Sequence, residues 1–238
     1  MSFSELICKT GQAVRAKHVR RKEARPGELL DAALDLFVAK GYAATRAEEV
    51  AAKAGVSKGT LFLYFKSKEE LFEAVVRENI TSVIAQGAAE LETFEGTAAE
   101  LLRYVMFEWW NRFGSTKASG ITKLVMSEAS NFPALANFYQ ETVVKPGHHL
   151  TRAILQRGID RGEFRTLNME YAVYSVIAPL MFLTMWQHSI GPCSSGMPLD
   201  AQEFIESQAD ILIKGVLNID TDSSAAAPAT TPSKTEGH

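Results

Sequence analysis

The chain has 238 residues, of which 46% are hydrophobic and 22% are charged, and its formal net charge is −3. This composition is ordinary for a soluble globular protein of one or two domains, and the net charge argues against a nucleic-acid binder that is basic throughout. The charge is uneven, because residues 1–78 hold 14 Lys and Arg against 11 Asp and Glu, whereas residues 79–238 hold 11 against 17. The N-terminal third is therefore the part suited to a polyanion.

The two ends of the chain are predicted to lack a packed fold. Residues 1–25 are polar and basic without sustained periodicity, so we expect a flexible basic arm and no signal peptide. Residues 221–238 are small and polar, and they cannot bury enough apolar surface to fold, which predicts a disordered tail. Between the ends, apolar residues recur at helical spacing and no stretch alternates with period two, which predicts an all-α fold.

The first two helices are predicted from their boundary residues. The spacing of apolar residues predicts a helix from about Pro26 to Lys40, with Gly41 just past its end. We expect a second helix to begin at Thr45 as the capping residue, with Glu48 reaching back to it in a capping box. Gly55 then ends this short helix as a left-handed C-cap.

The next two helices are predicted to begin at serine residues. Ser57 starts a third helix, and Ser67 starts a fourth with a second capping box in the sequence Ser-Lys-Glu-Glu. Two short helices joined by a tight turn that contains Gly form a helix-turn-helix if they cross closely. An ordinary helical hairpin is the alternative that spacing alone leaves open.

Two lysines favour the DNA-binding alternative. Lys58 and Lys68 fall in the first turns of the third and fourth helices, where the helix dipole disfavours a cation by about 0.3–1 kcal/mol. A bound phosphate would reverse that effect, because helix N-termini present free N–H groups to anions. Gly59 costs about 1 kcal/mol of helix propensity, yet its missing side chain would let the backbone approach a groove wall.

Longer helices are predicted for the rest of the chain. They cover residues 68–92, 97–114, 118–130, 133–161, 167–189 and 200–217. Residues 171–199 contain no charged side chain and approach the ~20 residues of a transmembrane helix. Polar residues interrupt this segment and no basic cluster flanks it, so we expect a helix buried in the core or at a subunit interface, and no membrane span. The last two helices are the most apolar and the best candidates for a subunit interface.

Residues 26–76, PGELLDAALDLFVAKGYAATRAEEVAAKAGVSKGTLFLYFKSKEELFEAVV, resemble the DNA-binding domain of the TetR (tetracycline-repressor-like) family of bacterial transcriptional regulators. The matching elements are ALDLFVAKGYAAT, EVAAKAGVSKGTLF and YFKSKEEL. The segments LVMSEASNFPALANFYQETVVKP and GIDRGEFR also resemble the effector domains of some members. The resemblance implies a three-helix helix-turn-helix domain over residues 26–76, then a helical effector-binding and dimerisation domain over residues 77–220, with about nine helices in all.

The resemblance also implies which residues contact DNA. It assigns phosphate contacts to Thr45, Arg46, Tyr64 and Lys68, and it places Ser57, Lys58, Gly59 and Thr60 at the major groove or its edge. Leu61 and Phe65 would be core residues. The family commonly has Tyr where this chain has Phe62, so a hydroxyl contact is absent, although contact with a thymine methyl or a sugar remains open. Leu63 has no polar group and receives no specific contact.

Large, polarisable side chains suggest an effector site in the second domain. As a set they suit an apolar cavity for a small hydrophobic or aromatic ligand, whereas individually they suit an ordinary core. The candidate lining residues are Met106, Trp109, Phe113, Met126, Met181, Met185 and Trp186. The adjacent His148 and His149 point to different sides of a helix, and no acid or thiol stands at ligand spacing, so a metal site is not expected. No cofactor is expected either.

The resulting hypothesis is a homodimeric repressor that a ligand releases from DNA. Two recognition helices about one DNA turn apart, roughly 34–36 Å, would favour a palindromic operator on double-stranded DNA. The alternative is a helix-turn-helix protein without a small-molecule effector, controlled by a protein partner or associated with the nucleoid. An enzyme is not expected, since no nucleophile and base stand at a recognisable spacing. Cys8 and Cys193 lie far apart, which fits the reducing cytoplasm.

Overall fold

The computed structural model describes residues 26–193 and 199–218. The expected basic arm, the expected disordered tail and Cys8 lie outside these residues. The all-α prediction is confirmed, because the only β-type pairing in the described ranges is an isolated bridge between Phe164 and Leu217. Merging helices that continue without a break gives nine helical segments in the described part of the chain, besides a short 3-10 turn at Gly191–Cys193.

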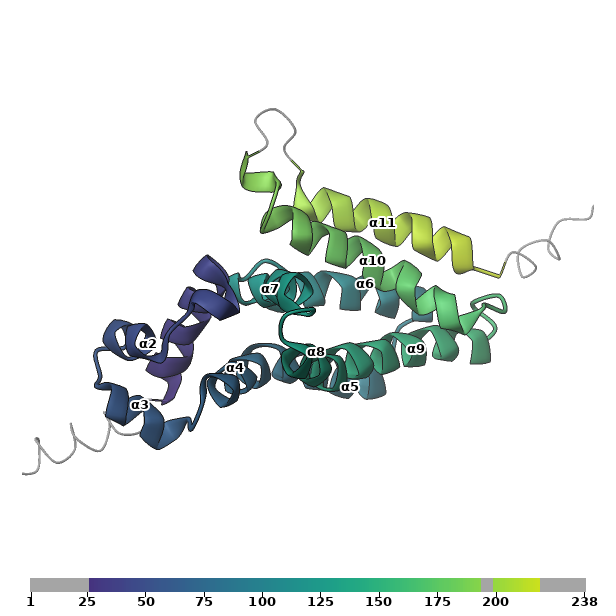
Figure 1. The fold of residues 1–238 in the computed structure, drawn as a ribbon. Helices are drawn as coiled ribbons and strands as arrows, with labels where there is room; N and C mark the ends of the chain where they lie inside the picture. Colours follow the sequence, from purple (N-terminus) through teal and green to yellow (C-terminus); the bar gives the residue numbers. More distant parts are fainter. Residues whose placement is uncertain (1–25, 194–198, 219–238) are drawn as a thin grey trace, which may run out of the picture.

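Four of the segments lie in the N-terminal part of the chain (Figure 1). They are the first helix over residues 26–44, α2 (Ala47–Lys53), α3 (Lys58–Tyr64) and a long helix that begins with α4 (Lys68–Val76). A π-helical turn over Arg77–Thr81 joins α4 to α5 (Ser82–Thr93), so the long helix predicted over residues 68–92 is confirmed.

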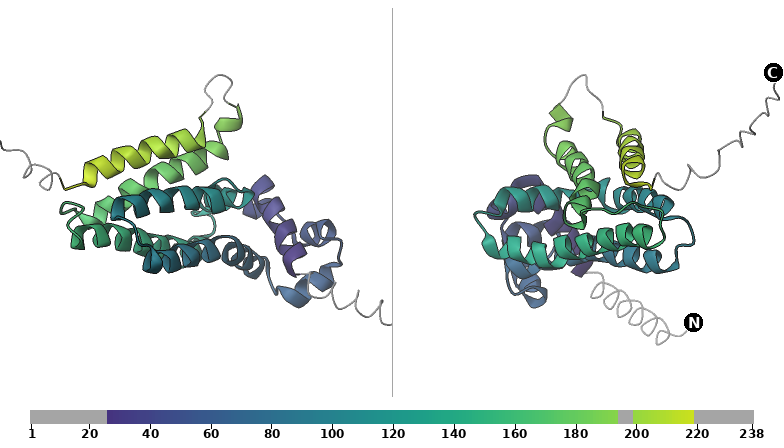
Figure 2. Two further views of the ribbon diagram at one scale, coloured as in Figure 1. Left: turned by 180° about the vertical axis from the view of Figure 1, so that it is seen from behind. Right: turned by 90° about the vertical axis from the view of Figure 1, so that its right-hand side faces the viewer.

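The other five segments agree with the predicted ranges to within a few residues. They are α6 (Ala98–Trp109) with its π-helical extension Trp110–Gly114, α7 (Gly120–Glu128), α8 (Pro133–Tyr139) continuing through Gln140–Val144 into α9 (Lys145–Asp160), α10 (Met169–Gln187) and α11 (Ala201–Val216). In both views of Figure 2, α10 and α11 lie side by side along one edge of the molecule.

The apolar side chains form two buried clusters. The first cluster joins the first helix and α2–α4 to α7 and α8, through residues that include Leu29, Phe72, Ile121 and Leu135. The second cluster joins α6 and α9 to α10 and α11. The helices near the N-terminus therefore share one core with part of the helical region that follows them.

Local caps explain why the short helices stop and start where they do. Ser57 and Ser67 are the N-caps of α3 and α4, as predicted. Gly55 ends α2 with a left-handed φ of 67°, and the N–H of Val56 donates to the carbonyl of Ala51 at 2.9 Å, which is a Schellman motif. The predicted capping box at Ser67 is only half correct, because Glu70 accepts the N–H of Lys66 instead.

Two other predicted boundaries are wrong. Helix α2 is capped by Arg46 and not by Thr45, and Glu49 takes the place expected of Glu48 by accepting the N–H of Arg46 at 3.1 Å. The first helix is assigned through residue 44, past Gly41, whose φ is 86°. Positive φ at glycine lets the chain tighten into the turn before α2 without a steric cost.

Helix α10 is long and apolar enough to cross a membrane, judged by length and composition alone. Within the single chain, 28% of its most apolar 18-residue stretch is buried. Burial of this helix in the core is therefore not found within one chain, and its burial at a subunit interface stays a prediction. Tyr171, Tyr174 and Phe182 are 64%, 55% and 50% exposed. The core of one chain therefore covers only part of the surface of α10.

Candidate DNA-binding surface and effector region

Helices α2 and α3 pack as a tight pair around small and apolar side chains. Val50 and Ala51 of α2 and Leu61 of α3 are at most 1% exposed, and Gly55 makes the turn between the helices. Phe65, just after α3, is also buried, as expected of a core residue. Since Leu61 and Phe65 fix the inward side of α3, the opposite side of this helix faces outward, and α3 lies at one end of the molecule (Figure 1).

The hydroxyl groups of α3 already have partners within the protein. The Ser57 Oγ accepts the N–H of Thr60 at 3.1 Å, and the two hydroxyl oxygens lie 2.9 Å apart. Ser57 and Gly59 are exposed and Thr60 is half-buried, so their positions agree with a place at a groove edge. Their first role in the free protein is to cap α3.

Lys58 is exposed at the start of α3, but it is paired with an acid. Its Nζ lies 2.6 Å from the Glu48 carboxylate, and both side chains are 55% exposed. The ammonium also lies 5.7 Å from the centroid of the Phe62 ring. The hydrogen bond from Lys58 is the main cause that lowers the pKa of Glu48. A phosphate would have to share or replace Glu48 to reach this lysine.

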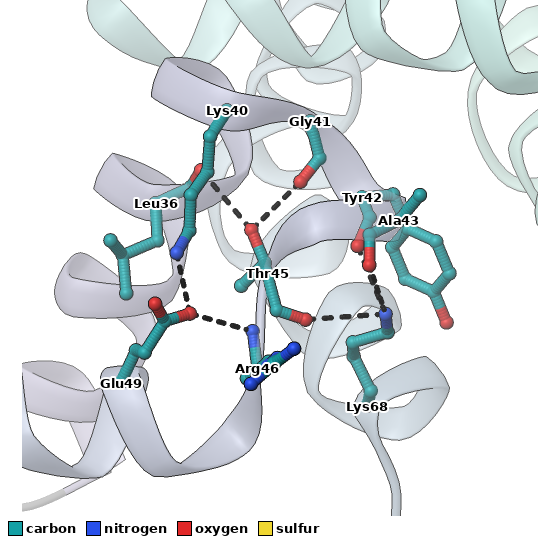
Figure 3. A network of polar contacts seen from close by, with 9 residues as sticks. All are labelled: Leu36, Lys40, Gly41, Tyr42, Ala43, Thr45, Arg46, Glu49 and Lys68. Atoms are coloured by element: carbon teal, nitrogen blue, oxygen red, sulfur yellow. Dashed lines mark hydrogen bonds and ion pairs between the residues drawn. The ribbon is translucent and has the colours of Figure 1, made fainter.

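A side chain that binds a phosphate of DNA would point outward, whereas the Lys68 side chain points toward the protein backbone. Its Nζ donates to the carbonyl oxygens of Tyr42 at 2.9 Å, Thr45 at 3.2 Å and Ala43 at 3.4 Å (Figure 3). An ammonium has three donors, so these carbonyls can take all of them. The geometry therefore argues against the predicted phosphate contact by this side chain and makes Lys68 a link between α4 and the turn before α2.

The Thr45 side chain is also turned away from solvent. It is 1% exposed, and its hydroxyl lies 2.7 Å from the Gly41 carbonyl and 3.2 Å from that of Leu36 (Figure 3). The predicted phosphate contact through this hydroxyl is therefore wrong. Arg46 is exposed beside it, so a phosphate contact by Arg46 remains a prediction, as does the contact by the half-buried Tyr64.

Leu63 is the residue of this surface that the sequence interpretation missed. It is 84% exposed, the highest value among the large hydrophobic residues described, and the neighbouring Phe62 is 38% exposed. Helical spacing could have revealed that Leu63 is exposed. Leu61 and Phe65 are one turn apart on the buried side, so the residue midway between them lies on the opposite side.

The candidate effector residues do not form one group. Met106 and Phe113 are buried but belong to different clusters, while Trp109 packs against both clusters. Met181, Met185 and Trp186 are half-buried. Met126 is 62% exposed on α7, so its prediction as a cavity-lining residue is wrong. A helix that packs only one side against the core leaves every third or fourth residue in solvent.

A surface hollow lies elsewhere, between α6 and α11. It has a volume of about 530 Å³, it is open to solvent, and Phe107, Gln202, Glu203, Glu206 and Ser207 line it. None of these is a predicted effector residue. Across the described ranges, no cluster of three metal-ligating side chains occurs.

A half-buried cluster of charged side chains between α5 and α6 was also missed by the sequence interpretation. Arg112 of the α6 extension pairs with Glu90 and Glu108, each at 2.7 Å, and these ion pairs raise the pKa of Arg112. The second carboxylate oxygen of Glu90 and the hydroxyl of Thr81 are buried without a hydrogen-bond partner among the described residues. Buried polar atoms of this kind are suited to a bound polar group.

Comparison with known proteins identifies both parts of the chain. Residues 29–75 match the model of the tetR family of bacterial regulatory proteins, and residues 95–192 match the tetracyclin repressor-like C-terminal domain. The HTH-type transcriptional repressor KstR2 of Mycolicibacterium smegmatis is 28% identical over 193 residues, which are 81% of this chain and 90% of that protein. The fatty acid metabolism regulator protein of Bacillus subtilis is 24% identical over 62% of this chain and 74% of its own length.

The solved structures agree with the fold. The transcriptional regulator FadR from Bacillus subtilis, determined in complex with stearoyl-CoA, aligns with a TM-score of 0.64. The alignment covers 79% of this chain and 97% of FadR at 21% sequence identity, which supports a common fold.

Proposed function

The chain belongs to the TetR family of bacterial regulatory proteins, and we propose that it is a homodimeric repressor that a small hydrophobic effector releases from a palindromic operator. It is a DNA-binding transcriptional regulator, and α3 is the proposed recognition helix. The observation that carries this assignment is the pairing of α2 with α3, which leaves the outward side of α3 free at one end of the molecule. We propose the cytoplasm as its place of action.

The proposed dimer interface is the uncovered side of α10 and α11. It presents Tyr171, Tyr174 and Phe182 of α10 and Ile211 of α11, all at least 50% exposed in the single chain. Several large apolar side chains exposed on two adjacent helices mostly mark a contact with another molecule. A second copy of the chain, related by a two-fold axis, would cover the surface and place two α3 helices on one duplex.

The proposed effector is hydrophobic with a polar group. Relatives of this chain include a fatty acid metabolism regulator and a protein solved with stearoyl-CoA, so acyl compounds are the first class to test. Buried Met and aromatic side chains around α6 and α10 could contact an apolar chain. The Thr81 hydroxyl, which has no hydrogen-bond partner among the described residues, could donate to its polar end. The effector must bind the two states of the protein unequally, or it shifts nothing.

A mobility-shift experiment tests this proposal. The full chain is mixed with DNA that flanks its own gene, with and without a panel of fatty acids, acyl-CoAs and steroids. Loss of the shift with one compound supports an effector-released repressor. A shift that no compound alters would favour the alternative, a helix-turn-helix protein without a small-molecule effector. A chain that shifts no DNA at all would overturn the proposed function.

A further inference from the structure

The polar groups at the start of α3 are already engaged within the protein. The Ser57 and Thr60 hydroxyls lie 2.9 Å from each other, and Ser57 caps the helix. The Lys58 ammonium is held by Glu48 at 2.6 Å. These groups must exchange an existing partner before they can bind a base edge, so they are poor first candidates for sequence recognition.

The outward side of α3 beyond these groups is apolar. Gly59, Phe62 and Leu63 stand at positions i, i+3 and i+4, which lie together on one side of a helix. Leu63 is 84% exposed and Phe62 is 38% exposed. Apart from its two chain neighbours, a Cβ built on Gly59 would meet only the Ser57 Oγ, at 3.8 Å, so no more distant part of the chain covers this position. The strip of Gly59, Phe62 and Leu63 is therefore open to an approaching surface.

We propose that Phe62 and Leu63 recognise the C5-methyl groups of thymine in the major groove, an inference that rests on the proposed DNA-binding function of α3. The thymine methyl is the apolar group that the four bases of DNA present on the major-groove edge. The exposed cations Arg46, Lys58 and Lys66 lie in the same part of the chain, which suits an occupant with phosphates around an apolar contact. The half-site should therefore contain thymine opposite the strip.

Removal of single methyl groups from the DNA tests the proposal directly. The full chain is used to select duplexes from a random pool, and each thymine of the selected site is then replaced by deoxyuridine, which lacks only the methyl group. We expect one or two replacements per half-site to weaken binding roughly three- to five-fold each, as loss of one buried methyl predicts. The salt dependence should not change, since no charge is altered.

The matching protein variant is Leu63→Ala, which should weaken binding to the thymine duplex and make it insensitive to deoxyuridine at the contacted position. Met126→Ala is the control, because Met126 is another exposed apolar residue, at 62%, on α7. Equal thermal melting of both variants and the unchanged chain would exclude misfolding, and Leu63 is exposed enough to make that the expected result.

The outcomes separate this inference from the proposed function. Binding that no deoxyuridine replacement weakens would overturn the methyl contact and leave the DNA-binding function standing. The same holds if Leu63→Ala loses affinity equally for the thymine and deoxyuridine duplexes. A chain that enriches no sequence from the pool would overturn both.

Discussion

The Lys68 ammonium lies 4.3 Å from the centroid of the Tyr42 ring and donates to the carbonyl oxygen of the same residue at 2.9 Å. Lys68 begins α4, while Tyr42 lies in the last turn of the first helix and packs its ring against Phe72 and Phe132. Carbonyls at the end of a helix attract a cation, and an aromatic face adds to that attraction. This contact joins the start of the long α4–α5 helix to the turn that precedes α2.

Replacing Lys68 should therefore affect stability more than phosphate binding. We expect Lys68→Ala to lower the free energy of unfolding by about 1–2 kcal/mol, because three carbonyls lose a charged donor. DNA affinity should fall while the slope of log K against log salt stays unchanged. Urea unfolding and binding titrations at several salt concentrations measure these effects. Lys66→Ala is the control for stability, since this neighbour is exposed. A slope reduced by about one would mean that Lys68 reaches a phosphate after all.

Replacing Lys58 should affect DNA binding more than stability. Lys58→Ala should reduce the salt slope by about one without a comparable loss of stability, because the exposed pair with Glu48 contributes little to folding.

Glu48→Gln should raise the affinity for random-sequence DNA several-fold at low salt, because it frees Lys58 and removes a negative charge beside the recognition helix. Fluorescence anisotropy with a labelled random duplex measures the change. Glu141→Gln is the matched control, since Glu141 is also an exposed acid in an ion pair, with Lys145 at 2.6 Å. Unchanged random-DNA affinity in Glu48→Gln would show that the carboxylate does not restrain Lys58.

Gly120 should tolerate no side chain, because three helices meet there. A Cβ on this residue would lie 2.7 Å from Val38 of the first helix and 3.3 Å from the His188 ring after α10. We expect Gly120→Ala to destabilise the chain by about 1–3 kcal/mol through overpacking. Val38→Ala in the same chain should recover part of this loss. Gly147→Ala, where a Cβ meets nothing within 4 Å, should be neutral or stabilising. Equal melting temperatures for the Gly120 and Gly147 variants would contradict the crowded junction.

His188 should make stability depend on pH. Its Nε2 lies 2.6 Å from the Ser119 Oγ, which also lies 2.8 Å from the carbonyls of Gly114 and Thr116, so the serine proton goes to a carbonyl and the imidazole N–H donates to Oγ. Burial, and then the charge of Lys123, lower the pKa of His188 below its ordinary 6.5. The unfolded chain therefore binds a proton more readily than the folded one, and stability is lost as the pH falls below 6.5 toward the lowered pKa.

Thermal melting between pH 7.5 and 5.5 measures this loss. The melting temperature should fall toward pH 5.5, and His188→Asn should reduce the fall because asparagine keeps a donor but does not titrate. His148→Asn is the necessary comparison, since burial also lowers the pKa of His148. If the two asparagine variants lost stability with pH as steeply as the unchanged chain, neither histidine would be responsible.

The uncovered side of α10 and α11 should control self-association. Ile211→Asp should raise the dimer dissociation constant at least ten-fold, because a buried unpaired carboxylate is costly at an interface. Met126→Asp is a matched control, as both residues are 62% exposed but Met126 lies on α7. Sedimentation velocity measures both. An Ile211→Asp chain that stays dimeric would place the interface elsewhere.

The amino-acid sequence alone determined the structural features that depend only on residues close together along the chain. The helical segments, the caps at Ser57 and Ser67 and the left-handed turn at Gly55 follow from local hydrogen bonds and backbone sterics, and they are confirmed apart from the end of the first helix and the cap of α2. The family resemblance over residues 26–76 likewise rests on an ordered set of such local features, and the match over residues 29–75 agrees with it.

Only the tertiary structure decided which partner each polar or apolar side chain meets. The sequence could not reveal that Lys68 turns toward carbonyls 23 to 26 residues away, that Thr45 is buried by the first helix, or that Met126 faces solvent. A lysine at a helix start has the same sequence context whether its ammonium binds a phosphate or a carbonyl. The choice depends on how α4 packs against the turn before α2, and that packing is fixed by the shared hydrophobic core and not by any local sequence.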